Sequence, residues 1–538
     1  MNLKALFFKS LIVLFTFNQV AKADMEVAVQ LYNKGDFEAA FNEYIVHANE
    51  GDPLAQHAIA DFYRQGFGVD KNMALAIGWY NKSAEQDNSN AQYNLAIIYS
   101  QGLDVVKNMI EAEKWYIKAA DLENVNAQYD LALSYREGSF GTVDHDFAFK
   151  WFLKVANTGF FQAQYYTGLS YEEGLGTVAD PDEAFKWHKL AADQGFAESQ
   201  YKIGFFHEDQ SSKFHDVSLA YVWATLAREN GQSLAVELMK KITTRISETE
   251  IANAQVILGE MNVLGIGTAE NPNRGTNWYY MSAIGGNAEA QYKLGVSYHL
   301  GIGISLSTTE AEKWYRRSAE QGFPDAQFIL GGLYEVGEVV EQNTEEAIKW
   351  YNLAADKGNA DAINALALLY MFGNGLEQDV EKGIALLQAN SVAGHAGSQL
   401  VLGQLYYNGE GVEQSFDNAV LWLAKSALQA NNEAQYIIGT MYKDGVGVEA
   451  DQELALDWFS KAAILGNVDA QYIHGLMAYI GQGIEVSKHY GLAWLYVAAS
   501  NGHAQAQQAI NGVVGELSQT DITEAKLMSE DFRLNLIR

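Results

Sequence analysis

The chain has 538 residues, 48% of them hydrophobic, and a formal net charge of −31, because 67 Asp and Glu outnumber 36 Lys and Arg. The hydrophobic content is enough for a packed interior and excludes a largely disordered chain. The negative charge disfavours nucleic acid and anionic membranes as main partners, since both carry phosphates. The absence of cysteine excludes disulfides, thiolate metal sites and cysteine nucleophiles.

The first 23 residues have the pattern of a secretory signal peptide. Lys4 and Lys9 accompany an apolar stretch from Leu11 to Phe17, and Ala21-Lys22-Ala23 matches an A-x-A cleavage site. The alternative is an uncleaved anchor, but the stretch is shorter than the ~20 apolar residues of a membrane span. We therefore expect cleavage after Ala23 and a periplasmic or secreted protein, with no membrane span in the rest of the chain.

Residues 24–50 predict a helical hairpin that caps the N-terminal end of the fold. The sequence LYNKGDFEAAFNEY has apolar residues at helical spacing on both sides of Gly35-Asp36, which is a turn signal. This segment is similar to a plain tetratricopeptide hairpin.

A period of 36 residues organises the chain from about residue 50 to about residue 510. The dipeptide Ala-Gln, or a close variant, recurs at this step, and we call its first residue the anchor. The anchors are Ala55, Ala91, Ala127, Ala163 and Ser199, followed by Ala254, Ala290, Ala326, Ala362, Ser398, Ala434, Ala470 and Ala506. All 11 Trp lie 24 residues after an anchor, and among the twelve repeats from Ala55 to Ala470 Leu386 occupies the one such position without Trp. A period of this length is typical of solenoid repeats.

Each repeat predicts two antiparallel helices. In the unit that starts at Ala290, apolar residues at four-residue spacing mark the buried stripe of the first helix. Gly301 and Gly303 are expected to end that helix in a left-handed conformation. The residue five after the anchor is always small, here Gly295, so that the second helix can approach closely. We expect the indole of Trp314 to fill the space beside it.

These patterns resemble the Sel1-like repeat family, a branch of the tetratricopeptide-like helical solenoids. Two sequence runs carry the resemblance, and they occur together, in close form, at 290–322 and 434–466. They are A-Q-Y-x-L-G-x-x-Y-x-x-G-x-G and A-x-x-W-Y-x-x-A-A-x-x-G. The resemblance implies an all-α, right-handed α-solenoid of about twelve helix-turn-helix repeats.

The repeat series is interrupted once. Five periods after Ala55 lead to Ala235, but the next anchor, Ala254, comes 19 residues later. We interpret this as two ancestral arrays in tandem, 51–246 and 247–510, with a bend or a change of twist near 236–253. The alternative is a random insertion.

A doubled signature favours the tandem interpretation. Ser247 lies 12 residues after Ala235, and Ser518 lies 12 residues after Ala506. Each Ser is followed three residues later by an acidic residue, which is typical of a capping box at a helix start. We therefore expect a cap helix after Ser247 that is reused as the first helix of the second array, and a C-terminal capping helix and tail at 511–538.

No catalytic or nucleotide-binding motif stands in a supporting context. The G-x-G tracts end helices instead of opening them after a strand, unlike phosphate loops. The polar run HEDQSSKFHD at 207–216 breaks the repeat and offers the metal-type ligands His207, Glu208, Asp209, His215 and Asp216. Their spacing matches no known helix-borne site, so we favour a solvated loop and predict no metal, no cofactor and no catalytic residue.

The first helices of a solenoid line its concave side, which is the expected binding surface. The family resemblance places the residues two and nine after each anchor there, and the second position varies, with Met371 and Tyr407 among its members. The candidate partner-binding residues are Tyr93, Tyr129, Tyr165, Tyr201, Tyr292, Phe328, Tyr436 and Tyr472 at the first position and Arg64, Arg136 and Lys443 at the second. Tyrosine supplies contact area at low entropy cost. The same rings could equally pack between neighbouring repeats.

We therefore predict a non-enzymatic scaffold or adaptor that binds a protein or peptide on its concave face, in envelope assembly or signalling, as Sel1-like proteins commonly do. One alternative is a hydrolase directed at cell-wall or β-lactam substrates, although the chain lacks the cysteines of such relatives and any S-x-x-K nucleophile. Another is a passive spacer. The sequence leaves the oligomeric state open.

Overall fold

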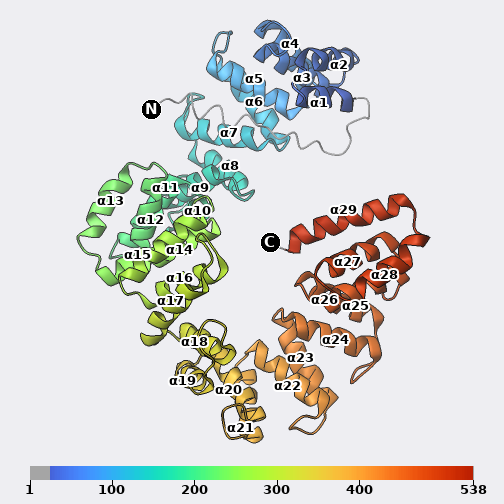
Figure 1. The fold of residues 1–538 in the computed structure, drawn as a ribbon. Coiled ribbons are helices and arrows are strands. Elements are labelled where there is room, and N and C mark those ends of the chain that lie inside the picture. The colour runs from blue at the N-terminus through green and yellow to red at the C-terminus, as the bar shows by residue number, and fades with distance from the viewer. Residues whose placement is uncertain (1–24, 537–538) are drawn as a thin grey trace. The chain divides into compact units, whose positions relative to one another are not determined.

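The computed structural model describes residues 25–536, in which all regular secondary structure is helical (Figure 1). The predicted signal peptide, 1–23, lies outside the described residues. Each helix packs mainly against the helices before and after it, which is the arrangement of an all-α solenoid. Contacts divide the chain into two compact units, with the boundary between Gly275 and Thr276. The predicted arrays are defined by repeat register instead, and their boundary at 246/247 stays a prediction.

The first unit starts with the hairpin expected at 24–50. Its helices are α1 (Glu26–Asn33), α2 (Phe37–Asn49), α3 (Pro53–Gln65), α4 (Met73–Ala84), α5 (Ser89–Gln101), α6 (Met109–Asp121), α7 (Val125–Glu137), α8 (His145–Ala156), α9 (Phe161–Glu173), α10 (Pro181–Asp193), α11 (Ala197–Glu208), α12 (Val217–Glu229), α13 (Leu234–Thr243) and α14 (Glu248–Leu264). The rings of Tyr32 in α1 and Phe41 in α2 both meet Phe62 in α3, so the hairpin covers the first repeat.

The helix α15 (Pro272–Ile284) contains the unit boundary. The second unit continues with α16 (Ala288–Leu300), α17 (Thr308–Glu320), α18 (Pro324–Val336), α19 (Thr344–Ala355), α20 (Ala360–Phe372), α21 (Val380–Val392), α22 (Ala396–Asn408), α23 (Phe416–Leu428), α24 (Asn432–Asp444), α25 (Gln452–Ile464), α26 (Val468–Ile480), α27 (Lys488–Ser500), α28 (Ala506–Val513) and α29 (Gln519–Leu536). The stacked rings of Trp494 and Phe532, 4.9 Å apart, hold α29 on α27.

The ends of the first helix α16 follow from two residues. In α16 the side chain of Asn287 accepts a hydrogen bond from the amide of the anchor Ala290 at 2.9 Å, which caps the N-terminus. At the other end Gly301 adopts φ 71°, a left-handed conformation that glycine takes without strain. The helix end predicted at Gly301 is therefore confirmed.

The close approach of the two helices in a repeat depends on the small residue five after the anchor. A Cβ atom added to Gly295 would lie 2.7 Å from the ring of Tyr315, and one added to Gly439 would lie 2.9 Å from the ring of Phe459. The ring beside the small residue thus belongs to the residue after the tryptophan, and our assignment of that place to Trp314 was wrong. Trp314 itself is 7% exposed, with the Arg317 guanidinium 4.5 Å from its ring centre.

In ten repeats a buried glutamine joins the repeat to the segment before it, and Ile363 takes this position in the repeat that starts at Ala362. In α22 the Nε2 of Gln399 donates to the Ser391 carbonyl at the end of α21, at 2.9 Å, and its Oε1 accepts from Gln429 at 2.8 Å. The same amide-to-carbonyl bond is made by Gln56, Gln92, Gln128, Gln164, Gln200, Gln291, Gln327, Gln435 and Gln471. The Ser391 carbonyl also accepts the Gly394 amide at 3.1 Å, so the glutamine adds a second hydrogen bond to a carbonyl at the end of the preceding helix.

Both predicted capping boxes are present. Ser247 and Glu250 exchange side-chain and backbone bonds at the start of α14, and Ser518 and Asp521 do the same before α29. The anchor Ala254 lies within α14, which runs without interruption to the left-handed Gly265.

Candidate functional site

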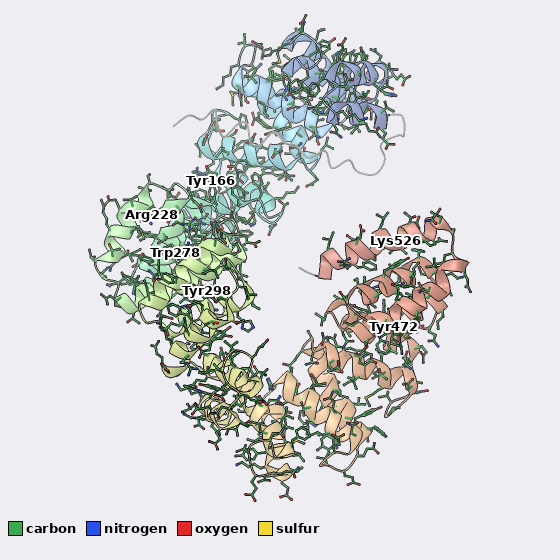
Figure 2. The ribbon with its side chains drawn as sticks, in the orientation of Figure 1. Tyr166, Arg228, Trp278, Tyr298, Tyr472 and Lys526 are labelled. Carbon is green, nitrogen blue, oxygen red and sulfur yellow. The ribbon has the colours of Figure 1, made fainter. Side chains whose placement is uncertain are left out.

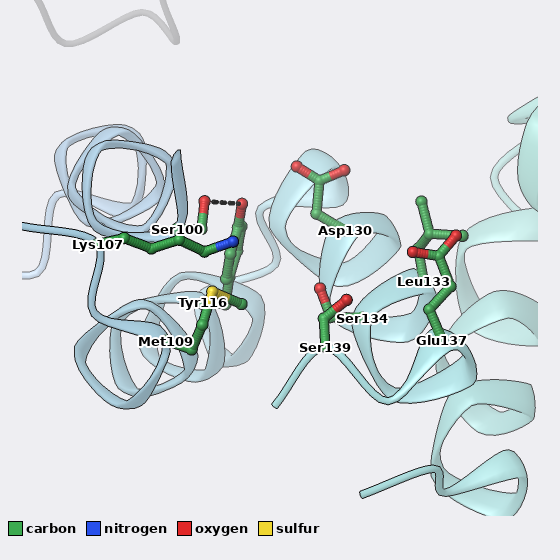
Figure 3. Close-up of a pocket in the computed structure, with 9 residues that line it drawn as sticks. All are labelled: Ser100, Lys107, Met109, Tyr116, Asp130, Leu133, Ser134, Glu137 and Ser139. Atoms are coloured by element: carbon green, nitrogen blue, oxygen red, sulfur yellow. Dashed lines mark hydrogen bonds between the residues drawn. The ribbon is translucent and has the colours of Figure 1, made fainter. Parts of the chain in front are cut away.

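A polar cavity of about 360 Å³ lies in the first unit between α5, α6 and α7 (Figure 3). On one side the Ser100 and Tyr116 hydroxyls lie 3.5 Å apart, and on the other side stands the carboxylate of Asp130. The remaining lining residues are Lys107, Met109, Leu133, Ser134, Glu137 and Ser139. This set of hydroxyls and charged groups suits a small polar group better than an apolar side chain.

The carboxyl of Asp130 is held by one of the candidate tyrosines. The Tyr93 hydroxyl donates to Asp130 Oδ2 at 3.0 Å and so bridges α5 and α7. Burial raises the pKa of Asp130 to about 6, although the hydrogen bond from Tyr93 acts in the opposite direction. The hydroxyl of Tyr93 is therefore already used within the protein.

A larger cavity, of about 520 Å³, opens on three successive first helices of the second unit. Its lining residues are Leu368, Met371 and Phe372 from α20, Val401, Gln404, Leu405, Tyr407 and Asn408 from α22, Tyr436, Ile437 and Thr440 from α24, and Glu410 from the loop after α22. Aliphatic and aromatic side chains form most of this wall, and a few polar groups stand among them. Such a lining suits the apolar side chains of a peptide.

The predicted tyrosine row packs largely against neighbouring aromatic rings. Three of its members meet the aromatic residue that opens the next first helix. They are Tyr129 on Phe160, Tyr165 on Phe196 and Tyr292 on Phe323, at 5.2, 5.3 and 5.3 Å between ring centroids. Tyr472, labelled in Figure 2, stacks on His503 at 4.2 Å.

The remaining members contact rings of their own repeat. Phe328 meets Tyr351 and Tyr436 meets Phe459, both at 5.8 Å, and Tyr201 meets Phe205 at 6.5 Å. Of the whole row, Tyr436 also lines the larger cavity. The packing role is thus present along the row, and a binding role for these rings stays a prediction.

The three basic candidates have partners within the chain. The Arg64 guanidinium pairs with Asp61 at 2.9 Å, and the Lys443 ammonium pairs with Asp444 at 2.6 Å. Arg136 lies over the ring of Tyr166, which Figure 2 labels, at 4.8 Å. A partner would have to compete with these contacts to use the three charges.

The polar run at 207–216 does not gather its metal-type ligands. The Nδ1 of His207 bonds to the Phe214 carbonyl at 2.5 Å, and the Nδ1 of His215 bonds to the His207 carbonyl at 3.0 Å. Glu208 turns away to form ion pairs with Lys241 and Arg245. His207 and Glu208 are 6% and 2% exposed, so our description of this stretch as a solvated loop was wrong for these two side chains.

Several residues that line the two cavities were not predicted from the sequence. Asp130, Val401 and Ile437 all lie three residues after an anchor, a position where the side-chain type varies along the chain. Met371 and Tyr407, both in the larger cavity, belong to the variable position nine residues after the anchor. The residue types at these two variable repeat positions are therefore the part of the sequence that could have indicated the cavity residues.

One group with metal-ligand chemistry was also missed. His489, Asp521 and Glu524 place one ligand atom each within 4.8 Å of one another, but Asp521 is already bonded to the amide and hydroxyl of Ser518. No helix among residues 25–536 combines the length and hydropathy of a membrane span.

The family model described as Sel1 repeat matches twelve segments, 53–88, 89–124, 125–159, 161–196, 197–232, 252–287, 288–323, 324–359, 360–389, 396–431, 432–467 and 468–503. A protective antigen of uropathogenic Escherichia coli with an SLR fold is 28% identical, over 92% of this chain and 95% of that one, with a TM-score of 0.43. A Sel1 repeat protein from Oxalobacter formigenes is 27% identical, over 61% and 90%, with a TM-score of 0.42. The chain matches no protein of the curated set.

Proposed function

The chain belongs to the Sel1 repeat family, whose scaffold fold typically serves protein interaction, and from this premise we propose that it is a non-enzymatic scaffold holding a protein or peptide partner. The binding surface in this proposal is the face formed by the first helices. The signal-peptide pattern of residues 1–23 supports a role outside the cytoplasm, in envelope assembly or signalling.

The observation that carries the proposal is the cavity of about 520 Å³ on α20, α22 and α24. Its apolar lining comes from three first helices in successive repeats, so a bound segment would span several repeats at once. Val401 and Ile437 are only half-buried although they are aliphatic. Covering them with a partner would be favourable by roughly 25 cal/mol per Å² of apolar surface.

A single substitution tests this surface. Thr440 lines the cavity, and its hydroxyl bonds only within α24, to the Tyr436 carbonyl, so Thr440→Arg should fill the cavity with charge and leave the helix intact. Leu421→Arg is the matched control, because Leu421 is 47% exposed on the second helix α23. Partners that co-purify with the tagged wild-type protein from an envelope extract should be lost in Thr440→Arg and kept in Leu421→Arg.

The outcomes separate the three functions. Full retention of every partner by Thr440→Arg would refute binding at this cavity. A wild-type protein that brings down no partner would favour the passive spacer. Nitrocefin turnover by the purified protein would favour the hydrolase, and we expect none.

A further inference from the structure

The first helix ends in a large apolar residue in three successive repeats of the second unit. This position, ten residues after the anchor, carries Leu300, Val336 and Phe372, which are 60%, 69% and 60% exposed. Asn408, Asp444 and Ile480 follow in the next three repeats, and the first unit has Gln65, Gln101, Glu137, Glu173, Asp209 and Leu264 at the same position. Large apolar side chains held in water in successive repeats form a candidate interaction surface.

A row of glutamates runs along the same loops. Fifteen residues after the anchor, five successive repeats carry Glu341, Glu377, Glu413, Glu449 and Glu485, and all of them are exposed. Among the described salt bridges none uses these carboxylates. The corresponding positions of the first unit are Asp70, Val106, Thr142, Val178, Phe214 and Ala269, and the second unit starts with Ser305, so the uninterrupted acidic row runs from Glu341 to Glu485.

The apolar row leads into the larger cavity. Phe372 belongs to both, and Asn408 and Glu410 form the cavity rim at the end of the next first helix. Leu300, Val336 and Phe372 end the first helices of three successive repeats, α16, α18 and α20. A helix that lies across these repeats could place apolar side chains of one face on each of them in turn.

We propose that the loop edge of the second unit binds a basic amphipathic helix of a partner protein, with its apolar side chains on the row from Leu300 to Phe372 and in the cavity, and its Lys or Arg side chains opposite the glutamate row. This inference rests on the proposed scaffold function and names the chemistry of the partner. Charge complementarity selects this occupant, because an acidic segment would place like charges together. An anionic membrane surface would be repelled in the same way.

The probe is a synthetic peptide of about 18 residues, built from Leu and Lys with Leu on one helical face, titrated into the full-length protein by fluorescence anisotropy. A second peptide keeps the Leu positions and replaces every Lys by Glu, and a third keeps the composition but scrambles the order. Only the first peptide should bind, and its affinity should fall as salt is raised, since the charges are exposed.

Two variants locate the site. Phe372→Asp should weaken binding at least about tenfold, as expected when an apolar anchor at the centre of an interface is lost. The pair Glu377→Lys and Glu413→Lys should weaken it at low salt and largely remove its salt dependence. Leu428→Asp is the control, because Leu428 is 77% exposed at the end of the second helix α23, and its peptide affinity should match the wild type.

Equal binding of the Lys and Glu peptides, or unchanged affinity in Phe372→Asp, would overturn the proposal. Binding to vesicles of anionic lipid in preference to the peptide would also overturn it. These results are distinguishable from failure of the scaffold function, because Thr440→Arg tests retention of native partners whatever their chemistry. If Thr440→Arg loses those partners and the wild-type protein does not bind the Leu/Lys peptide, the scaffold function stands and the basic helix is refuted.

Discussion

Replacing Gln399 by Leu should open the junction between α21 and α22. The side chain is 3% exposed, donates to the Ser391 carbonyl at 2.9 Å and accepts from Gln429 at 2.8 Å. Leucine fills a similar volume but removes two hydrogen bonds, each worth about 1 kcal/mol, while the Ser391 carbonyl keeps its bond from the Gly394 amide at 3.1 Å. We expect a local loss of about 2 kcal/mol.

Hydrogen exchange of the full-length protein measures this loss directly, because a repeat array opens locally and a single global free energy is poorly defined. Since 1.4 kcal/mol corresponds to a factor of ten, amides of α21 and α22 should exchange about 30-fold faster. Gln429→Ala is the control, since Gln429 is exposed and its loss leaves the bond to Ser391 in place. Exchange of Gln399→Leu within about threefold of the wild type would refute the role assigned to the glutamine.

Two further predictions concern packing and pH. Gly439→Ala should lower the local stability by about 1–3 kcal/mol, because the added Cβ would lie 2.9 Å from the Phe459 ring. Gly78→Ala should raise the local stability by up to about 1 kcal/mol, because its Cβ would have nothing within 4 Å. Local hydrogen exchange should therefore become faster in the first variant and slower in the second. The folded-state pKa of Asp130, about 6, lies above its ordinary value of 3.8, so the folded protein binds this proton more tightly than the unfolded chain does. The free energy of unfolding therefore falls by about 3 kcal/mol as the pH rises from about 4 to about 6. Asp130→Asn should therefore have a higher urea midpoint than the wild type at pH 7 and a similar one near pH 4, and a lower midpoint at pH 7 would contradict this.

The hairpin of each repeat could be predicted because its determinants are local. Anchors, glycines and tryptophans recur in phase, and the capping boxes at Ser247 and Ser518 need only four consecutive residues each. The assignment of Trp314 to the place beside Gly295 failed because Trp314 and Tyr315 are adjacent aromatic residues. Periodicity shows that both are on the buried side of a helix but not which one meets the glycine.

The surroundings of Glu208 could not be predicted, because its partners Lys241 and Arg245 come from the segment that breaks the repeat. The repeat pattern also places Tyr436, Met371 and Tyr407 on the predicted binding side, but it does not show that α20, α22 and α24 leave a cavity between them. That space depends on how neighbouring first helices pack, which no single repeat encodes.

The most direct test of the central claim is hydrogen exchange of the full-length protein with and without the Leu/Lys peptide. The claim is that partners bind across the first helices of the second unit, at the cavity and the apolar row. Bound peptide should protect the segments 368–372, 404–410 and 436–440, which line the cavity, and leave the second helices α21 and α23 unchanged. Protection confined to α21 and α23, or to the first unit, would contradict the account.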